Sequence, residues 1–199
     1  MCRFVPERAA LGQPRTCVSG DPCCRASFVP PGAVLEAVDR VLHGEAHNAF
    51  CAVRPPGHHA GVELHCMGAV SNGFCILNNV ALAALYAHHY GNVGRVAVVD
   101  FDVHHGNGTQ DVLCRTQHPG FLYASIHAFN RGEGENTSQA KIFPGTGADG
   151  EAHDNVLNIP LGDQVHPAGF HAATARVVTA LEKFKPNLIL LSAGFDAHQ

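Results

Sequence analysis

The stretch that decides the fold is Val96–Gly108, which reads VAVVDFDVHHGNG. It begins with an apolar run, Val96–Val99, of the kind that forms a buried parallel strand. The chain then changes abruptly to carboxylates and imidazoles within Asp100–His105 and closes with Gly106–Gly108. Polar groups at the end of a buried strand are costly unless something pairs with them, and a metal ion is the usual partner. We therefore expect functional chemistry at the carboxyl end of this strand.

The bulk composition excludes several classes of protein. The chain has 199 residues, of which 46% are hydrophobic and 15% charged, and this suits one soluble α/β domain with a real core. No apolar run approaches the roughly 20 residues needed to span a membrane. The first residues lack the apolar stretch of a secretory signal peptide. The net charge of −4 gives no whole-protein reason to bind nucleic acid or an anionic membrane directly.

The eight cysteines are expected to be reduced thiols. Cys51, Cys75 and Cys114 lie in or beside apolar runs, where a free cysteine behaves as a small hydrophobic residue. Because no secretory signal is present, a cytosolic or nuclear setting is favoured over a disulfide framework. The cysteines of the N-terminal stretch form no C-x-x-C pair, so a zinc knuckle is disfavoured there.

The order of elements predicts an α/β fold. Residues 1–31 are rich in proline, show no periodicity and are expected to form an irregular leader before a domain over 32–199. The hydrophobic spacing predicts helices over 32–43, 77–90, 108–114 and 169–184, and strands over 48–53, 96–99, 121–126, 155–161 and 188–191. This alternation favours a mostly parallel sheet with helices on both faces. The long glycine-rich segment 128–154 is expected to be functional.

Polar residues follow three of these strands. His58–His59 follow the first, Asp100–His105 the second and Asp196 the last. In open α/β sheets the ligand site lies at the carboxyl ends of the strands. Asp102 and His104 are two residues apart, so on an extended strand they would point the same way, and Asp196 would be the natural third ligand. Two oxygen donors and one nitrogen donor suit zinc, and also iron(II) or cobalt(II).

The adjacent histidines would supply acid–base groups, because imidazole titrates near neutrality. A carboxylate or amide behind each ring would fix its tautomer, and Asp100 and Asn107 are the candidates. Asp100 could instead help hold a monovalent cation. Each motif taken alone has a structural interpretation: a D-x-H pair at a strand end, an HH pair in a proline-rich loop and a plain GFD turn. Their joint occurrence at three strand ends favours one site.

These residues also carry a resemblance to a known family. The chain resembles the zinc-dependent histone deacetylases and their relatives, the acetylpolyamine amidohydrolases and acetoin-utilisation proteins. Asn107, together with RPPGHH, looks more like the class II branch. The resemblance covers about residues 32–199, and its motifs are RPPGHHA (54–60), GFCILNN (73–79), VVDFDVHHGNGTQ (98–110), FPGTG (143–147), NIPL (158–161) and LSAGFDAH (191–198).

The resemblance implies a role for each matching residue. It makes Asp102, His104 and Asp196 the zinc ligands. His59 would be the principal general base and acid and His58 its electrostatic partner, backed by Asn107 and Asp100 respectively. The implied substrate tunnel consists of Gly73, Phe74 and Phe143, and the implied potassium site of Asp100, Asp102, His104 and Ser125.

The resemblance further implies hydrolysis of the acetyl amide of N6-acetyl-lysine in histones or other proteins, with release of acetate. Such an enzyme would act in the nucleus or the cytoplasm, in transcription regulation, and could join a corepressor complex. The family's oxyanion-binding tyrosine would lie beyond Gln199, so we expect a partial domain, truncated at its C-terminus, of doubtful activity. Two alternatives stay open: an acetylpolyamine or small-amide amidohydrolase, and a catalytically inactive metal-binding fragment.

Overall fold

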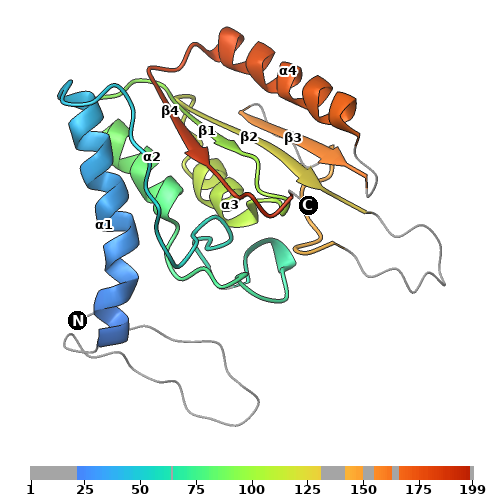
Figure 1. The fold of residues 1–199 in the computed structure, drawn as a ribbon, viewed down its shortest axis with the longest axis horizontal. Helices are drawn as coiled ribbons and strands as arrows, with labels where there is room; N and C mark the ends of the chain where they lie inside the picture. The colour runs from blue at the N-terminus through green and yellow to red at the C-terminus, as the bar shows by residue number, and fades with distance from the viewer. Residues whose placement is uncertain (1–21, 64, 131–141, 150–154, 163–165, 198–199) are drawn as a thin grey trace.

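The computed structural model describes residues 22–63, 65–130, 142–149, 155–162 and 166–197, without the side chains of 22–25. Four strands of this part of the chain form a parallel sheet in the order β3-β2-β1-β4 (Figure 1). The elements in chain order are α1 (Pro22–Leu42), the short 3-10 helix η1 (Cys66–Gly68), α2 (Asn79–His89), β1 (Val96–Asp100), α3 (Asn107–Arg115), β2 (Phe121–Ala128), β3 (Val156–Leu161), α4 (Pro167–Phe184) and β4 (Leu188–Ser192).

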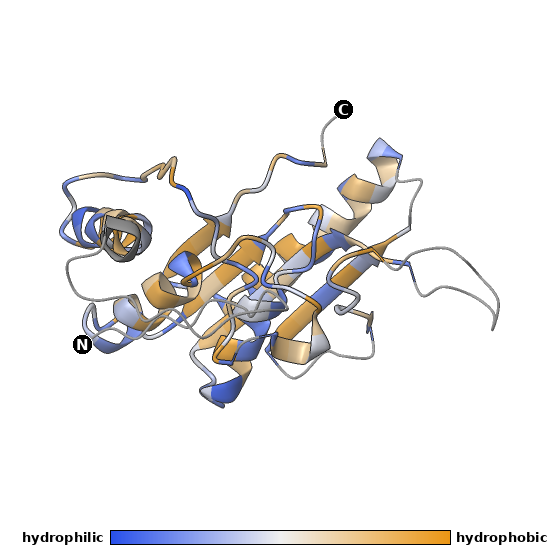
Figure 2. Ribbon diagram, turned by 90° about the horizontal axis from the view of Figure 1, so that it is seen from below, coloured by the Kyte–Doolittle hydropathy of each residue, from blue (hydrophilic) through white to orange (hydrophobic). Residues whose placement is uncertain are grey.

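Helices cover both faces of the sheet, as the sequence predicted. Alternate residues of a strand point to opposite faces, so β1 contributes to two cores. Val96 and Val98 pack in the core that includes residues of α1, α2 and α3, whereas Val99 packs in the core that includes Ala173 and Val177 of α4. Figure 2 shows hydrophobic residues concentrated along the strands between these helical layers. The α/β fold class is therefore confirmed.

The strand order reverses beside β1. The chain adds β2 and then β3 on one side of β1, crosses the sheet through α4, and places β4 on the other side (Figure 1). Ligands in open α/β sheets bind at such a switch point, outside the carboxyl ends of the strands. The residues after Asp100 of β1 and Ser192 of β4, which pair in register, meet at this point.

Two predicted elements differ in the structure. Residues 48–53 were expected to form a buried strand, but they join no ladder, and Phe50 is 77% exposed. An apolar run forms a strand only where a neighbouring edge can pair with its backbone. The first helix begins at Pro22 rather than at residue 32, so 22–31 are helical and not irregular. It continues through the buried Pro30 and Pro31, whose packing offsets the lost backbone hydrogen bonds.

The other predicted helices and strands are present, but their first or last residues differ from the prediction. β2 runs two residues further than predicted and includes His127. Residues 1–21, and 131–141 and 150–154 of the predicted functional loop, lie outside the described residues. Among the cysteines whose side chains are described, Cys51, Cys66, Cys75 and Cys114 are free thiols, as expected. The helices of the described part are all too short or too polar to cross a membrane.

Candidate metal and acid–base site

The first part of the site is the turn that follows β1. Asp102 and His104 were expected on an extended strand, but β1 ends at Asp100 and the chain bends, because side-chain oxygens there bind the backbone. Asp102 Oδ1 accepts a hydrogen bond from the backbone N–H of His104 at 2.8 Å. This turn also places Asp102 Oδ1 3.0 Å from His104 Nδ1. The two side chains thus meet for a reason other than strand alternation.

Asp196 joins them from the loop after β4. Its Oδ2 lies 3.0 Å from His104 Nδ1, and its Oδ1 accepts a hydrogen bond from the backbone N–H of Val103 at 3.1 Å. Ligand atoms of Asp102, His104 and Asp196 all lie within 4.8 Å of one another. A Cβ at Gly194 would collide with the Asp102 carboxylate, so only glycine allows the β4 loop to approach this closely.

The donor set fits a divalent cation. Burial is the largest single influence on Asp102 and disfavours its ionisation, but the hydrogen bonds with His104 and the charges of His58 and His104 together lower the pKa of the carboxyl. The side-chain hydrogen bond raises the pKa of His104, which the charges of Asp102 and Asp196 also favour. The two carboxylates therefore favour a positive charge at the point that they surround. Two carboxylates and one imidazole are ligands that zinc accepts, with a further position left for water or substrate.

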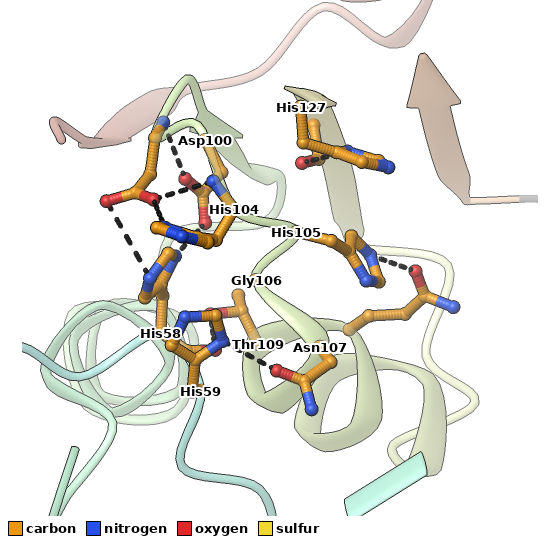
Figure 3. A network of polar contacts seen from close by, with 12 residues as sticks. His58, His59, Asp100, His104, His105, Gly106, Asn107, Thr109 and His127 are labelled. Atoms are coloured by element: carbon orange, nitrogen blue, oxygen red, sulfur yellow. Dashed lines mark hydrogen bonds and ion pairs between the residues drawn. The ribbon is translucent and has the colours of Figure 1, made fainter. Parts of the chain in front are cut away.

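His58 forms a pair with Asp100 behind the cluster (Figure 3). Its Nδ1–H donates to Asp100 Oδ2 at 3.0 Å, and its Nε2 lies 3.8 Å from Asp102 Oδ2. Burial opposes protonation of His58, but the charge and hydrogen bond of Asp100, together with the charges of Asp102 and Asp196, raise the pKa of the imidazole. Tyr123 steadies the region by donating its hydroxyl hydrogen to the carbonyl of Gly106 at 3.1 Å. His58 is thus the histidine that favours the charged form.

His59 forms a second, different pair with Asn107 (Figure 3). Asn107 Nδ2 donates to the backbone carbonyl of Cys66 at 3.1 Å, so the amide oxygen faces His59 Nδ1, which donates to it at 2.8 Å. Burial and the neighbouring His58 lower the pKa of His59 to about 4, and the neutral amide does little to oppose them. At neutral pH His59 is therefore uncharged, with its Nε2 lone pair available.

Sequence reasoning missed the residues that hold the histidine turn. Thr109 donates its backbone N–H to the carbonyl of His58 at 3.0 Å, and Asn78 Nδ2 donates to the carbonyl of Ala60 at 2.9 Å. Cys66 Sγ donates to the carbonyl of His59 at 3.6 Å. Thr109 and Asn78 lie inside motifs that the sequence singled out, but Cys66 lies in the loop between two motifs and follows no pattern.

The predicted tunnel residues divide into two groups. Gly73 has a φ of +50°, and a Cβ there would stand 3.1 Å from both His59 Nε2 and a ring carbon of Phe143. The Phe143 ring lies edge-on to His59, with centroids 4.8 Å apart. Phe74, in contrast, is 87% exposed. The structure therefore brings Gly73 and Phe143 to the histidine pair and leaves the Phe74 ring at the surface.

Ser125 lies beside the site on the neighbouring strand. It is in register with Asp100, and both residues are fully buried. Its hydroxyl lies 2.9 Å from His127 Nδ1. Ser125 thus lies next to Asp100, with its hydroxyl within hydrogen-bond distance of a histidine, and the potassium site stays a prediction.

Comparison with known proteins identifies the class and then the family. The fold is shared with solved structures: the HDA15 HD domain matches with a TM-score of 0.73 and 36% identity. An acetylpolyamine aminohydrolase from Burkholderia pseudomallei matches with a TM-score of 0.68 and 32% identity. The family model for the histone deacetylase domain matches residues 7–199. The chain therefore belongs to the histone deacetylase family.

The chain covers only part of its relatives. It is 42% identical over 184 residues to type-2 histone deacetylase 2 of Dictyostelium discoideum. This match covers 88% of this chain and 10% of that protein. The match to the HDA15 domain covers 88% of this chain and 48% of that structure, and the match to the aminohydrolase covers 90% and 48%. The chain thus spans about half the length of these solved relatives.

The contrast between the two histidine pairs predicts the effect of Asn107→Asp. A carboxylate behind His59 would favour the imidazolium, and we expect the pKa of His59 to rise by roughly 1–3 units. The ring would then lose its proton at higher pH, so the fraction of neutral His59 at pH 5 to 6 would fall. Titration of the imidazole resonances by NMR measures this. Asn92→Asp, which adds the same charge on an exposed turn, should leave the titration of His59 unchanged.

Proposed function

We propose that this chain carries the metal-binding and acid–base part of a zinc-dependent deacetylase that hydrolyses the acetyl amide of N6-acetyl-lysine in proteins. One observation carries the proposal: the cluster of Asp102, His104 and Asp196 lies beside two histidines of opposite tendency, His58 with a raised pKa and His59 with a lowered one. Histone deacetylases are in general zinc-dependent, and the donor set fits that ion.

Asp102, His104 and Asp196 would hold the zinc ion. When bound, zinc would supply a Lewis acid that polarises the amide carbonyl and makes a water molecule more acidic. Asn107 keeps the proton of His59 on Nδ1, so Nε2 can take the proton from the attacking water. The same Nε2–H would then protonate the leaving amine nitrogen, which gives acetate and a free lysine. Asp100 raises the pKa of His58, and in its protonated form His58 would stabilise the negative charge that develops nearby.

Gly73 and Phe143 would contact the stem of the acetyl-lysine, because they lie against His59 where the amide must be attacked. Of the three tyrosines, Tyr86 donates its hydroxyl to Asp39 and Tyr123 to the carbonyl of Gly106, and Tyr90 is exposed at the end of α2. Loss of one oxyanion donor typically costs about 10²–10³ in rate. We therefore expect slow turnover from this chain by itself.

The proposal also covers the substrate, its location in the cell and a potassium ion. The substrate would be an acetylated histone or another protein, met in the nucleus or the cytoplasm as part of transcription regulation, with a corepressor complex as a partner. A potassium ion would bind near Asp100, Asp102, His104 and Ser125, and replacement of potassium by a large organic cation in the assay buffer would lower the activity.

A second candidate substrate is an acetylpolyamine. The similarity to the Burkholderia pseudomallei aminohydrolase, at 32% identity, favours keeping it in the test. The ratio of kcat/KM for an acetyl-lysine peptide to that for acetylspermidine discriminates between the two. A ratio well above one supports the protein substrate, and a ratio well below one overturns it.

The decisive experiment uses the zinc-loaded chain. Acetate release from an acetyl-lysine peptide is measured with one equivalent of zinc bound, and a hydroxamate is expected to inhibit it. If zinc binds stoichiometrically but neither substrate is hydrolysed, the chain is a metal-binding segment without turnover. If no divalent metal binds to the folded chain, the proposal fails.

A further inference from the structure

Two buried histidines of the described chain belong to neither acid–base pair. His105 follows the metal-ligand turn and His127 lies on β2, and their exposed fractions are 0% and 2%. Their rings lie 4.6 Å apart (Figure 3). Both rings are bonded on each nitrogen, and one partner of each ring, Thr146 or Gly147, lies in the same short loop.

The hydrogen bonds of His105 define its tautomer. Its Nε2 lies 2.9 Å from Gln110 Oε1, which also accepts a bond from Asn158 Nδ2 at 2.9 Å. The proton of the neutral ring is therefore on Nε2. The other nitrogen, Nδ1, must accept, and it lies 2.8 Å from the hydroxyl of Thr146. Thr146 is thus bound through its side chain to a ring that is fully enclosed.

His127 binds the next residue of the same loop. Its Nε2 lies 2.9 Å from the backbone carbonyl of Gly147, which can only accept, so Nε2 carries the proton. The hydroxyl of Ser125 then donates to Nδ1 at 2.9 Å. Gly147 has a φ of +93°, and a Cβ there would come within 2.7 Å of atoms of both rings. The loop therefore packs against the two imidazoles so closely that no side chain fits between them.

The loop that these contacts hold also carries Phe143, which lines the site beside His59. Thr146 lies three residues after Phe143, whose ring stands edge-on to His59 at a centroid distance of 4.8 Å. We propose that His105 and His127 are positioning residues that clamp Thr146 and Gly147, and so hold Phe143 against His59, where the acyl chain would pass. The statement that an acyl chain passes there rests on the proposed function, whereas the statement that the two histidines position Phe143 does not.

The test uses tryptophan fluorescence, because the sequence contains no tryptophan. Phe143→Trp in the zinc-loaded chain places one reporter on the clamped loop. In this background Thr146→Val removes the hydroxyl but keeps the shape. We expect acrylamide quenching of the tryptophan to rise at least about twofold, because His105 Nδ1 loses its donor. Thr146→Ser should restore the original quenching.

Thr179→Val is the matched control, because it removes a threonine hydroxyl that donates to the carbonyl of Ala175 within α4. It should leave the quenching unchanged. Equal quenching in the Thr146→Val and parent chains would overturn the clamp. Loss of the far-UV circular dichroism signal in Thr146→Val would also overturn it, because the hydroxyl would then support the whole fold rather than the loop.

An activity assay separates this inference from the proposed function. With Phe143 restored, Thr146→Val should raise KM for an acetyl-lysine peptide, and Thr146→Ser should return it, with zinc stoichiometry unchanged in both. If quenching changes but no variant, including the parent, hydrolyses an acetylated substrate, the proposed function fails and the clamp stands. If the chain is active and Thr146→Val alters neither quenching nor KM, the clamp alone fails.

Discussion

Asp196→Asn is expected to weaken zinc binding by at least about 10²-fold, because loss of a mere supporting partner of a metal ligand already costs 10–100-fold. Asp196 is the one carboxylate of the cluster that comes from the loop after β4 rather than from the turn after β1. Without its charge, Asp102 and His104 form an incomplete site for a divalent ion. Competition with a chromophoric chelator measures the affinity. Zinc should also raise the melting temperature of the parent chain more than that of the variant.

Asp149→Asn is the control for this experiment, because it removes a carboxylate whose side chain is 68% exposed and 4.0 Å from Arg176. Its zinc affinity should equal that of the parent. If the Asp196→Asn variant binds zinc as tightly as the parent, Asp196 is not a zinc ligand. The loops after β1 and β4 would then meet without forming a shared zinc site. Loss of zinc binding in both variants would point to a general charge effect.

The sheet could be predicted because its strands carry their own signals. The five residues of β1 are all buried, and such a strand appears in the sequence as a continuous apolar run. Residues 48–53 show the same pattern but form no strand, because pairing depends on a neighbouring edge that the pattern does not specify. The prolines of α1 caused the opposite error. They predicted an irregular segment, but the helix continues through them with Pro30 fully buried.

The part of the site that could be predicted is the set of motifs that follow the strands, because the carboxyl ends of parallel strands lie at one edge of the sheet. The structure brings Asp100 to His58 and Asn107 to His59. The strand-end argument named both partners, and the resemblance implied which histidine each one faces. It could not be foreseen that His104 meets Asp102 through a turn. The clamp was also not foreseeable, because His105 reaches Thr146 across 41 residues, and a single buried histidine leaves no periodic pattern.

His59→Ala is expected to lower kcat of any deacetylation by about 10²–10⁴-fold, the usual contribution of a positioned proton-transfer group. Zinc stoichiometry should stay unchanged, because the ring is not part of the cluster. The alanine variant also loses the packing of Phe143 and leaves the buried Asn107 Oδ1 without its donor, which costs about 1–3 kcal/mol of stability. A drop in rate could therefore reflect a distorted site.

His59→Gln separates the two causes. A glutamine amide can donate to Asn107 and fill part of the ring's space, but it cannot take up a proton near neutral pH. If proton transfer is the function of His59, the glutamine variant should be as slow as the alanine variant while its melting temperature is higher. His89→Ala, at the exposed end of α2, should keep the parent rate. A glutamine variant with more than about a tenth of the parent kcat would show that His59 positions Phe143 and Asn107 rather than transferring the proton.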